Sequence, residues 1–490
     1  MPPGALEKHD LWSTLKDGRF YTIPEDELIR QVYRAFKPET ERLKGAYAVE
    51  RNTPPRIELN GESIPRTPSQ TLFDEDFDEI NRTYLGILAL RWLMNGDYTR
   101  FTKGQLRKVR LTESSFNWLR DYFQENLKTP TDLLTLILSM VVNDLGKDPS
   151  LVHDHFAKGN SSLHGSNHDT ILLEAARAGL VECLEYLDEP QRDKVMLGLE
   201  LGSELNAGQL AQAENVPVNL SGLLIMEGQE SAFHLKFMEQ MLDVAGAAGH
   251  VFADGSKNLI EPVFQAFKTV LDVSLCIIRG QCSLREGYDR VLSRRASLLE
   301  HEGFKLLSVT NNKERALLRL LTMGRAATRK QAELFEEAFD ELKEPFQTLL
   351  VEGLNIDAIK DTETAVIPYY MPAMIAETLR STRGSGMEKE ALTALMRYLA
   401  RVLHWKPEDD EAQLPPLIEG KAATWPPRLQ IHIPPAPREG RVFERNMTKA
   451  RDTISSAQFR QNPSILDDLP PPEAYLLQRR RTSHAICSYV

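Results

Sequence analysis

The sequence predicts an all-α protein, a single large helical bundle with an irregular, proline-rich arm at each end. Three observations support this fold class. Apolar residues recur at helical spacing over much of residues 76–405, no convincing alternating strand pattern occurs, and no motif returns at a fixed period. We therefore expect an extended N-terminal arm with one or two short helices over 1–75, a helical catalytic core over 76–405 and a proline-rich tail over 406–490.

The helices of this core follow from apolar periodicity and from residues that begin or end helices. Leu133 to Val142 is apolar nearly all round, so this helix should be central to the core. Thr129 can cap it, Pro130 fits its first position, and Asp132 suits the positive end of the helix dipole. The other expected helices lie within residues 81–96, 112–127, 167–187, 192–217, 230–250, 258–280, 313–342 and 387–405.

Charge and composition argue against some classes of function. The 490 residues include 59 Lys and Arg and 70 Asp and Glu, a formal net charge of −11. This excess of acid argues against a binder of nucleic acid or of anionic membranes, which normally presents a basic face. The 4 cysteines show no C-x-x-C spacing, and sparse cysteine is typical of a reducing compartment. With no run of about 18 apolar residues and no apolar segment at the start, we expect a cytoplasmic protein without a membrane span.

The central helix runs directly into a polar segment, "VVNDLGKDPS". An amide and a carboxylate, Asn143 and Asp144, stand at the end of a helix predicted to be buried, and Gly146 and Lys147 follow. Burying an unpaired carboxylate is costly, so such a group is paired, hydrogen-bonded, metal-bound or placed in a wet cleft. Taken alone, the segment is explained by Asp144 capping the next turn, Gly146 ending the helix and Lys147 acting as a counter-charge.

Polar residues also recur on later core helices, and this recurrence favours a functional interpretation. Two of them, Asn167 and Asp169, are equally well explained as helix caps. Several semi-buried polar clusters on successive helices nevertheless predict one convergent site. The polar positions are His164, Asn167, His168, Asp169 and Glu174, then Asn206, Gln209, Gln212, Glu214 and Asn215, then Glu239, Asp243 and His250.

The segment "VVNDLGKD" resembles the "HDxGK" core of the HD-domain metal-dependent phosphohydrolases. In that all-α superfamily, a His-Asp pair ends a buried helix and binds one or two metals, and later histidines and a late aspartate complete the site. The resemblance implies Asp144 as the central ligand, His164 and His168 as the later histidines, and Asp243 as the closing carboxylate. The sequence departs from the family at Asn143, where the family has histidine.

The candidate ligands are mostly oxygen donors, and carboxylate and amide oxygens suit magnesium, whereas imidazole suits zinc, iron and manganese. A helical bundle with such groups at one end, an apolar aromatic interior and scattered Lys and Arg resembles a class I terpene cyclase. "NDLGKDPS" and "DTILLE" resemble loosened forms of that class's metal motifs, although the serine falls at Ser150 and no "DDxxD" stands in the expected place. As a whole, the chain is similar to the fungal α-humulene-synthase type of cyclase, a non-standard class I family without the usual metal motifs.

This resemblance implies a sesquiterpene lyase of fungal secondary metabolism, with Mg²⁺ as cofactor and a prenyl diphosphate, farnesyl diphosphate favoured, as substrate. Asp144, Asp169 and Asp243 would be the catalytic carboxylates. Other polar residues would bind the metal or orient its ligands. The full predicted metal-binding set is Asn143, Asp144, Asn167, His168, Asp169 and Asp243.

Basic and aromatic residues would complete the cyclase site. Arginine and lysine side chains suit phosphate groups, and cations are stabilised over aromatic faces. For each of these residues, a solvated helix face or an ordinary packed core is the simpler explanation. The predicted diphosphate-binding residues are Lys147, Lys257, Arg325 and Arg329, and the predicted pocket residues are Phe233, Phe237, Met241, Tyr369 and Tyr370.

Two other functions stay open at this point. One is an HD-type metal-dependent phosphohydrolase or di-iron oxygenase with an altered ligand set. The other is a non-enzymatic helical scaffold with its proline-rich tail as the binding element. Protein that carries bound iron, manganese or zinc would favour the HD type, whereas protein that binds pyrophosphate only with magnesium would favour the cyclase.

Overall fold

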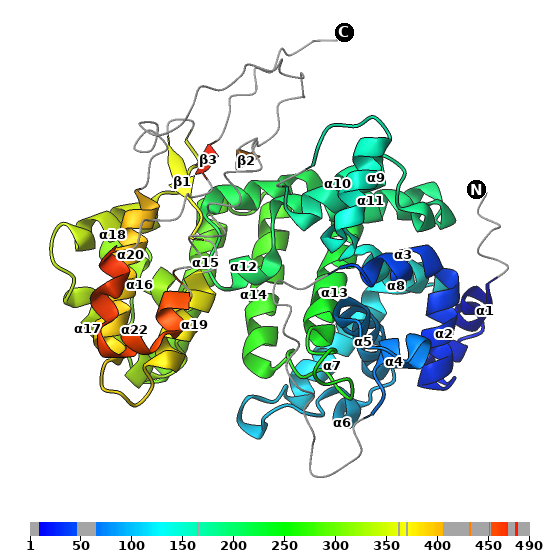
Figure 1. The fold of residues 1–490 in the computed structure, drawn as a ribbon, viewed down its shortest axis with the longest axis horizontal. Helices are drawn as coiled ribbons and strands as arrows, with labels where there is room; N and C mark the ends of the chain where they lie inside the picture. Colours follow the sequence, from blue (N-terminus) through cyan, green and yellow to red (C-terminus); the bar gives the residue numbers. More distant parts are fainter. Residues whose placement is uncertain are drawn as a thin grey trace, which may run out of the picture. The chain divides into compact units, whose positions relative to one another are not determined.

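The computed structural model of the chain describes residues 9–46, 65–163, 166–360, 363–368, 371–404, 431–432, 450, 452–468 and 476–478. Helices make up nearly all of its regular structure, so the predicted all-α class is confirmed (Figure 1). The helices gather into two compact units. Unit 1 comprises Met1–Ala207 and Gly222–Arg279, and unit 2 comprises Gly208–Ser221 and Gly280–Val490.

Unit 1 is built around three helices that pack on one another, α5, α8 and α13. Shorter helices and 3-10 turns connect and surround them. The elements are α1 (Asp10–Lys16), η2 (Arg19–Tyr21), α2 (Glu25–Ala35), α3 (Lys37–Leu43), α4 (Pro68–Phe73), α5 (Asp78–Met94), α6 (Tyr98–Phe101), η3 (Arg107–Val109), α7 (Glu113–Asn126), α8 (Pro130–Val142), η4 (Leu145–Lys147), α9 (Pro149–Ala157), α10 (His168–Arg177), η5 (Glu182–Tyr186), α11 (Glu189–Glu204), α13 (Glu230–Gly246) and α14 (Glu261–Ile278). Two further elements, α12 (Ala207–Ala211) and η6 (Pro217–Met226), contain the points where the chain passes between the units.

Helix α8 is the central, fully buried helix that the sequence predicts. Every residue from Leu133 to Val142 is buried. The Thr129 side chain accepts a hydrogen bond from the Asp132 backbone N–H, the Asp132 side chain caps in return, and Pro130 occupies the first turn. The predicted start of this helix is therefore confirmed, and its polar C-terminal end is held inside unit 1.

Helices α5 and α13 cross at close range because small residues line the crossing. A Cβ on Gly246 would lie 2.2 Å from the carbonyl oxygen of Arg82, and one on Gly249 would lie 2.3 Å from that of Asn81. On the facing helix, a Cβ on Gly86 would lie 2.8 Å from the carbonyl oxygen of Leu242. The small residues near the end of α13 therefore admit the backbone of α5.

In its described residues, the N-terminal region contains more helix than the predicted extended arm with one or two short helices. Three helices, α1 to α3, lie within residues 10–43, and Leu28, Val32 and Phe36 are 0% exposed. These residues follow the spacing i, i+4, i+8 of one helix face. The polar, proline-punctuated stretch that suggested an arm, "RNTPPRIELNGESIPRTPSQ", lies mostly outside the described residues.

Unit 2 is centred on helix α20, which packs against α17, α18 and α19. Its elements are α15 (Leu284–His301), α16 (Asn312–Met323), α17 (Arg329–Asp340), α18 (Phe346–Asn355), β1 (Thr364–Val366), α19 (Met371–Ser381), α20 (Glu388–Leu403), β2 (Ile431–His432), α22 (Ala457–Gln461), η9 (Pro463–Asp468) and β3 (Leu476–Gln478). The segment predicted as one helix or two over 313–342 forms two, α16 and α17.

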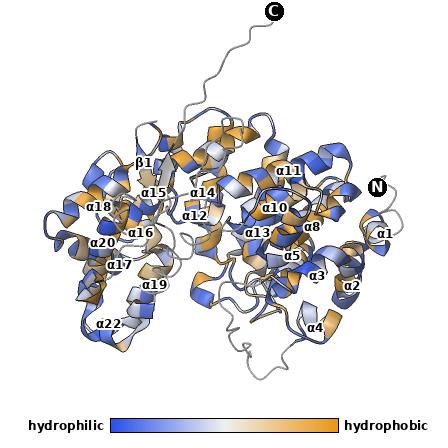
Figure 2. Ribbon diagram, turned by 45° about the horizontal axis from the view of Figure 1, so that its top comes forward, coloured by the Kyte–Doolittle hydropathy of each residue, from blue (hydrophilic) through white to orange (hydrophobic). Residues whose placement is uncertain are grey.

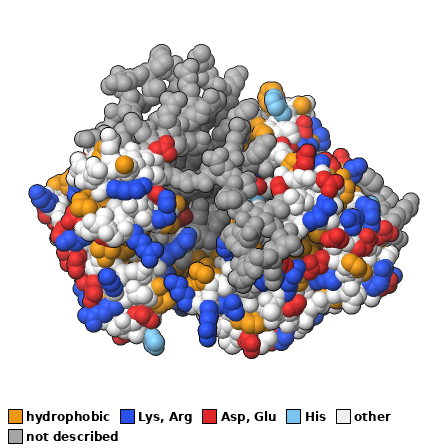
Figure 3. All heavy atoms as spheres, turned by 60° about the horizontal axis from the view of Figure 1, so that its bottom comes forward, with side chains coloured by type: hydrophobic (Ala, Val, Ile, Leu, Met, Phe, Trp, Pro, Cys, Tyr) orange, Lys and Arg blue, Asp and Glu red, His pale blue; other side chains and the backbone are white. Residues whose placement is uncertain are grey.

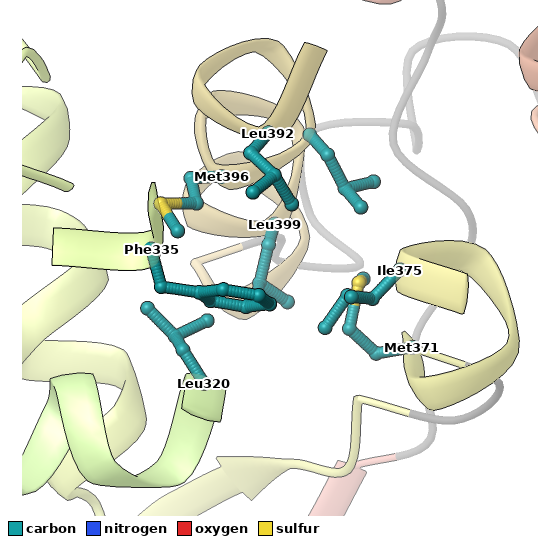
Figure 4. A pocket seen from close by; sticks show the side chains of 8 residues that line it. Leu320, Phe335, Met371, Ile375, Leu392, Met396 and Leu399 are labelled. Carbon is teal, nitrogen blue, oxygen red and sulfur yellow. The ribbon is translucent and has the colours of Figure 1, made fainter. Parts of the chain in front are cut away.

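A small cavity lies among four helices of unit 2 (Figure 4). Its volume is about 10 Å³, roughly the space of one water molecule. The side chains that line it are all apolar, so it is a gap in a hydrophobic core. The lining residues are Leu320, Phe335, Met371, Ile375, Leu392, Leu395, Met396 and Leu399.

Part of the predicted C-terminal tail is ordered against unit 2. Arg397 of α20 pairs with Asp467 of η9 at 2.8 Å, and Arg401 donates to the carbonyl of Leu466 at 2.6 Å. Strands β1, β3 and β2 form an antiparallel sheet in that order, with Val366 paired to Leu476. The sequence showed no strands because each has only two or three residues, too few for a visible alternation. The remainder of the tail lies outside the described residues.

The surface carries charges of both signs. The helices bear hydrophilic and hydrophobic residues together, as expected for helices with one buried face (Figure 2). On the face drawn in Figure 3, Lys and Arg side chains are interspersed with Asp and Glu side chains. Within the described residues, every helix is too short or too polar to cross a membrane.

Candidate functional site: a buried ion cluster in unit 1

Charged side chains from four segments of unit 1 meet in one place, which we call the unit 1 ion cluster. The segments are the start of α5, the α8–η4 turn, the start of α10 and the middle of α13. Helices α5, α8 and α13 pack on one another, and α10 packs on η4. The members are Glu79, Arg82, Asp144, Lys147, Asp169, Lys236, Glu239 and Asp243, with Asn143 and Ser139 hydrogen-bonded to them.

The α8–η4 turn is shaped by a close contact with α10. Helix α8 ends at Val142, and Leu145–Lys147 forms a 3-10 turn. A Cβ on Gly146 would lie 1.8 Å from the carbonyl oxygen of His168, so only glycine allows this approach. The contact brings the start of α10 against the turn that carries Asp144 and Lys147. The structural role of the glycine in "NDLGKD" is to allow this contact.

Lys147 is the cation of one half of the cluster. Its Nζ lies 2.7 Å from Asp144 and 3.3 Å from Glu79, and its side chain is 17% exposed. Arg82 pairs with Glu79 at 2.8 Å. The predicted counter-charge role of Lys147 is therefore confirmed, with Glu79 as a second carboxylate that the sequence did not reveal.

The two carboxyls of this half have pKa values shifted in opposite directions. Burial and the charge of Asp144 raise the pKa of Glu79 to about 7, although Lys147 and Arg82 oppose the shift. Burial also acts to raise the pKa of Asp144, but Lys147, a hydrogen bond with Glu79 and the charge of Arg82 outweigh it and hold the pKa of Asp144 well below its usual range. Near neutral pH, Asp144 is therefore ionised, while Glu79 is partly protonated.

Lys236 is the cation of the other half. Its side chain is 4% exposed, and its Nζ donates to Glu239 at 2.7 Å and to the side-chain oxygen of Asn143 at 3.2 Å. Ser139 donates to the second oxygen of Glu239 at 2.7 Å. Burial acts to lower the pKa of Lys236, but Glu239 and Asp169 outweigh it and raise that pKa, so the side chain stays charged.

Charges from both halves of the cluster act on Asp243. Among the described residues it makes no hydrogen bond and no ion pair. Burial and the charge of Asp144 raise the pKa of Asp243, and the charges of Arg82, Lys147 and Lys236 act against that rise. It is therefore a partly buried carboxylate surrounded by charges but held by none of them directly.

The start of α10 contributes one carboxylate and a cap. Asn167 caps this helix by accepting a hydrogen bond from the Thr170 backbone N–H at 2.8 Å. A helix cap is one of the two explanations for Asn167 that follow from the sequence. His168 is 42% exposed, and its Nε2 lies 3.5 Å from Asp169. The charge of Asp169 acts on Lys236, which places this carboxylate at the edge of the cluster.

Some of the predicted site residues do not belong to this cluster. Lys257 lies in unit 1, next to Ser256, whose backbone N–H binds the carbonyl of Phe101 at 2.8 Å. Arg325 and Arg329 are residues of unit 2. Their side chains bind Gln212 at 2.7 Å and Glu333 at 2.6 Å.

The predicted pocket residues of α13 are packed core residues. Phe233, Phe237 and Met241 are 4%, 2% and 1% exposed. The Phe233 and Phe237 rings lie 6.2 Å apart, and Phe237 also contacts Tyr122, with ring centroids 5.9 Å apart. These contacts match the simpler explanation, an aromatic core. His164, Tyr369 and Tyr370 lie outside the described residues.

Sequence reasoning missed three members of the cluster. Glu79 and Arg82 stand in the first turns of a helix, where acidic residues are usually exposed caps. Lys236 stands between Leu235 and Phe237 in an apolar run. The available signal was the i, i+3 spacing of Lys236 and Glu239 on a helix whose other residues are core-like, which indicates an internal ion pair.

The donor set of the cluster suits a hard divalent cation better than a soft one. Among the described residues, no three His, Cys, Asp or Glu side chains are placed to hold a metal by themselves. Mg²⁺ does not need such a cage, because it is commonly held by one or two carboxylates with water and substrate phosphate oxygens. Asp243 and Asp169 have no Lys or Arg ion pair in the described structure, and the cluster holds five carboxyl groups, of which Glu79 is partly protonated near neutral pH, against three cations. Oxygen donors of this kind are compatible with Mg²⁺.

The fold and this cluster define an all-α protein with a buried, acid-rich ion cluster at the junction of its central helices. A family of unknown function, DUF6829, matches residues 29–466, and the chain belongs to this family. No curated protein and no solved structure matches the chain.

Proposed function

We propose that the chain is a magnesium-dependent enzyme that acts on a diphosphate ester at the unit 1 ion cluster. Its predicted form is a terpene cyclase that ionises a prenyl diphosphate, farnesyl diphosphate favoured, and cyclises the carbocation. One observation carries the proposal. Asp144, Asp169 and Asp243, which are far apart in the sequence, contribute to one cluster together with Lys147 and Lys236.

Some residues of the cluster would position other side chains, and the others would bind the metal. The carboxylates of Asp144 and Glu79 hold the ammonium group of Lys147. The guanidinium group of Arg82 lies near the same two carboxylates. Lys236 orients the amide of Asn143. Asp243, Asp169 and the amide oxygen of Asn143 would hold the metal. Mg²⁺, when bound, would neutralise charge that develops on a diphosphate leaving group.

A second candidate is a phosphohydrolase of the HD type. The observation that favours it is that Asp144 and Asp243 belong to one cluster, in which the charge of Asp144 contributes to the raised pKa of Asp243. This pairing corresponds to the central and closing carboxylates of the HD resemblance. The two candidates differ in the bond that breaks, because a cyclase releases intact diphosphate from carbon, whereas a phosphohydrolase releases phosphate after cleavage of a P–O bond.

The experiment is an incubation of the purified full chain with geranyl, farnesyl and geranylgeranyl diphosphate in Mg²⁺, followed by volatile analysis and separate assays of phosphate and diphosphate. We expect a cyclic hydrocarbon and diphosphate from one substrate. Asp243→Asn should lower the affinity for Mg²⁺ by at least about tenfold. The matched control is Asp272→Asn, because Asp272 is an exposed carboxylate of α14 in the same unit.

The outcomes separate the candidates. Phosphate release without a volatile product would replace the cyclase by the phosphohydrolase. Neither product from any substrate, with Asp243→Asn unchanged in Mg²⁺ binding, would contradict both and leave a helical scaffold.

A further inference from the structure

Unit 2 contains three neighbouring arginines whose positive charges are poorly compensated. Arg294 and Arg295 are consecutive on α15, and Arg325 lies in the turn between α16 and α17. Arg295 Nη1 donates to the carbonyl of Ala326 at 2.6 Å, which places its guanidinium against the backbone that carries Arg325. Arg325 donates from Nε and Nη2 to the side-chain oxygen of Gln212 at 3.0 and 2.7 Å. The hydrogen-bond acceptors of the Arg295 and Arg325 side chains are therefore neutral oxygens.

The most buried of the three is also incompletely satisfied. Arg295 is 9% exposed, and its Nε is buried without a hydrogen-bond partner. Within the described part of the chain, Arg294 and Arg295 form no ion pair with a carboxylate. Burial and the charges of Arg294 and Arg325 lower the pKa of Arg295 to about 10. A buried donor without an acceptor costs stability, and a bound group with acceptor oxygens would remove that cost.

Two other buried arginines of unit 2, Arg315 and Arg319, have more hydrogen-bond or ion-pair partners than Arg295. Arg315 is 1% exposed and pairs with Asp289 at 2.7 Å and Asp357 at 3.5 Å. Arg319, equally buried, donates to backbone carbonyls, among them that of Asn215 at 2.8 Å. Arg315 therefore has two carboxylates beside it and Arg319 has several carbonyls. Arg315 Nη2 is also buried without a hydrogen bond, but Arg295 has only one carbonyl and no carboxylate among the described residues.

The backbone at the third arginine is unusual as well. Arg325 has φ +52°, in the left-handed region that residues with a side chain rarely adopt. Such conformations concentrate at binding sites, where the surrounding structure maintains them. Glu214 is a carboxylate whose charge acts on Arg325, but burial outweighs it and the pKa of Arg325 stays lowered.

We propose that Arg294, Arg295 and Arg325 form a binding site for a phosphate group of a small-molecule ligand. Guanidinium groups match tetrahedral oxyanions because their planar N–H donors bind two oxygens at once. A phosphate would supply acceptors for the donors that the protein leaves open and would offset the mutual repulsion of the three charges. This site belongs to unit 2 and does not depend on the function proposed for unit 1.

The test is a titration of the full chain with inorganic phosphate, without divalent cations, followed by calorimetry and thermal denaturation. Chloride at the same ionic strength corrects for screening. We expect phosphate to raise the melting temperature more than chloride does. Arg294→Gln should weaken phosphate binding by about 10- to 100-fold, the loss of one charge-assisted contact. Because Arg294 is only partly buried, this variant should fold, and without phosphate it should be at least as stable as the wild type.

The matched control is Arg329→Gln, since Arg329 is a nearby arginine of unit 2 whose side chain is 63% exposed and pairs with Glu333. It should bind phosphate like the wild type. Because the titration contains no divalent cation, it does not report on the metal-dependent site proposed for unit 1. Equal effects of phosphate and chloride, or equal phosphate affinity of Arg294→Gln and Arg329→Gln, would overturn the proposal.

Discussion

At the scale of single residues, Lys147 shows how structure changes an expectation from sequence. If Lys147 were a solvent-facing residue that only bound diphosphate, its side chain could be removed with little effect on the stability of the protein. In the structure, Lys147 is mostly buried and lies within 3.3 Å of two carboxylates, Asp144 and Glu79. Its removal would leave those carboxylates facing each other with less compensation, so it contributes to stability whatever else it binds.

Lys147→Ala is therefore expected to lower the free energy of unfolding by about 3–5 kcal/mol, the usual result of removing one partner of a buried ion pair. Urea denaturation measures this change. Lys313→Ala is the control, because Lys313 pairs with Asp340 on the surface at 3.0 Å with both side chains more than half exposed, and its loss should cost at most about 1 kcal/mol. Equal losses for the two variants would mean that the cluster is well solvated.

The same residues show why the site could be predicted only in part. Asn143, Asp144 and Asp243 are visible in the sequence because polar groups interrupt apolar runs. Glu79 is not visible, because its burial depends on α13 covering the start of α5, and no local pattern encodes that contact. Hydrophobic periodicity alone cannot predict which residues become partners through tertiary packing.

At the scale of elements, the ends of helices were easier to predict than their partners. Thr129 caps α8 as expected, and Thr112 caps α7 in the same way, because capping depends on residues only three positions apart. The crossing of α5 and α13 depends instead on Gly86 and Gly246, which look like weak helix residues until the facing backbone is known.

Gly246→Ala tests this crossing. The added methyl group would lie 2.2 Å from a backbone carbonyl of α5, and we expect a loss of about 1–3 kcal/mol from overpacking. The control is Gly198→Ala in α11, where the nearest atom to the new Cβ is a Lys236 side-chain carbon at 3.5 Å. That change should be neutral or stabilising by up to about 1 kcal/mol, because alanine favours a helix over glycine. If thermal denaturation ranks the two variants in the opposite order, the crossing is looser than the structure indicates.

At the scale of the whole molecule, the all-α class follows from helical periodicity, but the division into two units does not. The chain leaves unit 1 at Ala207 and returns at Gly222, and this short excursion has no change of composition to mark it. Arg319 of unit 2 binds the excursion through the carbonyls of Ala213 and Asn215. Every residue type has a backbone carbonyl, so these contacts cannot be recognised from the residue types. For this reason the composition predicted one core.

Because each unit has its own core, we expect calorimetry of the full chain to resolve two unfolding transitions. Gly246→Ala should lower the transition of unit 1. Phe335→Ala, which removes a ring that is 1% exposed beside the cavity of unit 2, should lower the other by about 3–5 kcal/mol in free energy. The sharp prediction is selectivity, since each substitution acts on a core that does not contain the other. A single transition that both variants shift as a whole would mean that the units unfold together, and the separate roles proposed for the unit 1 ion cluster and the unit 2 arginines would then have to be tested as coupled.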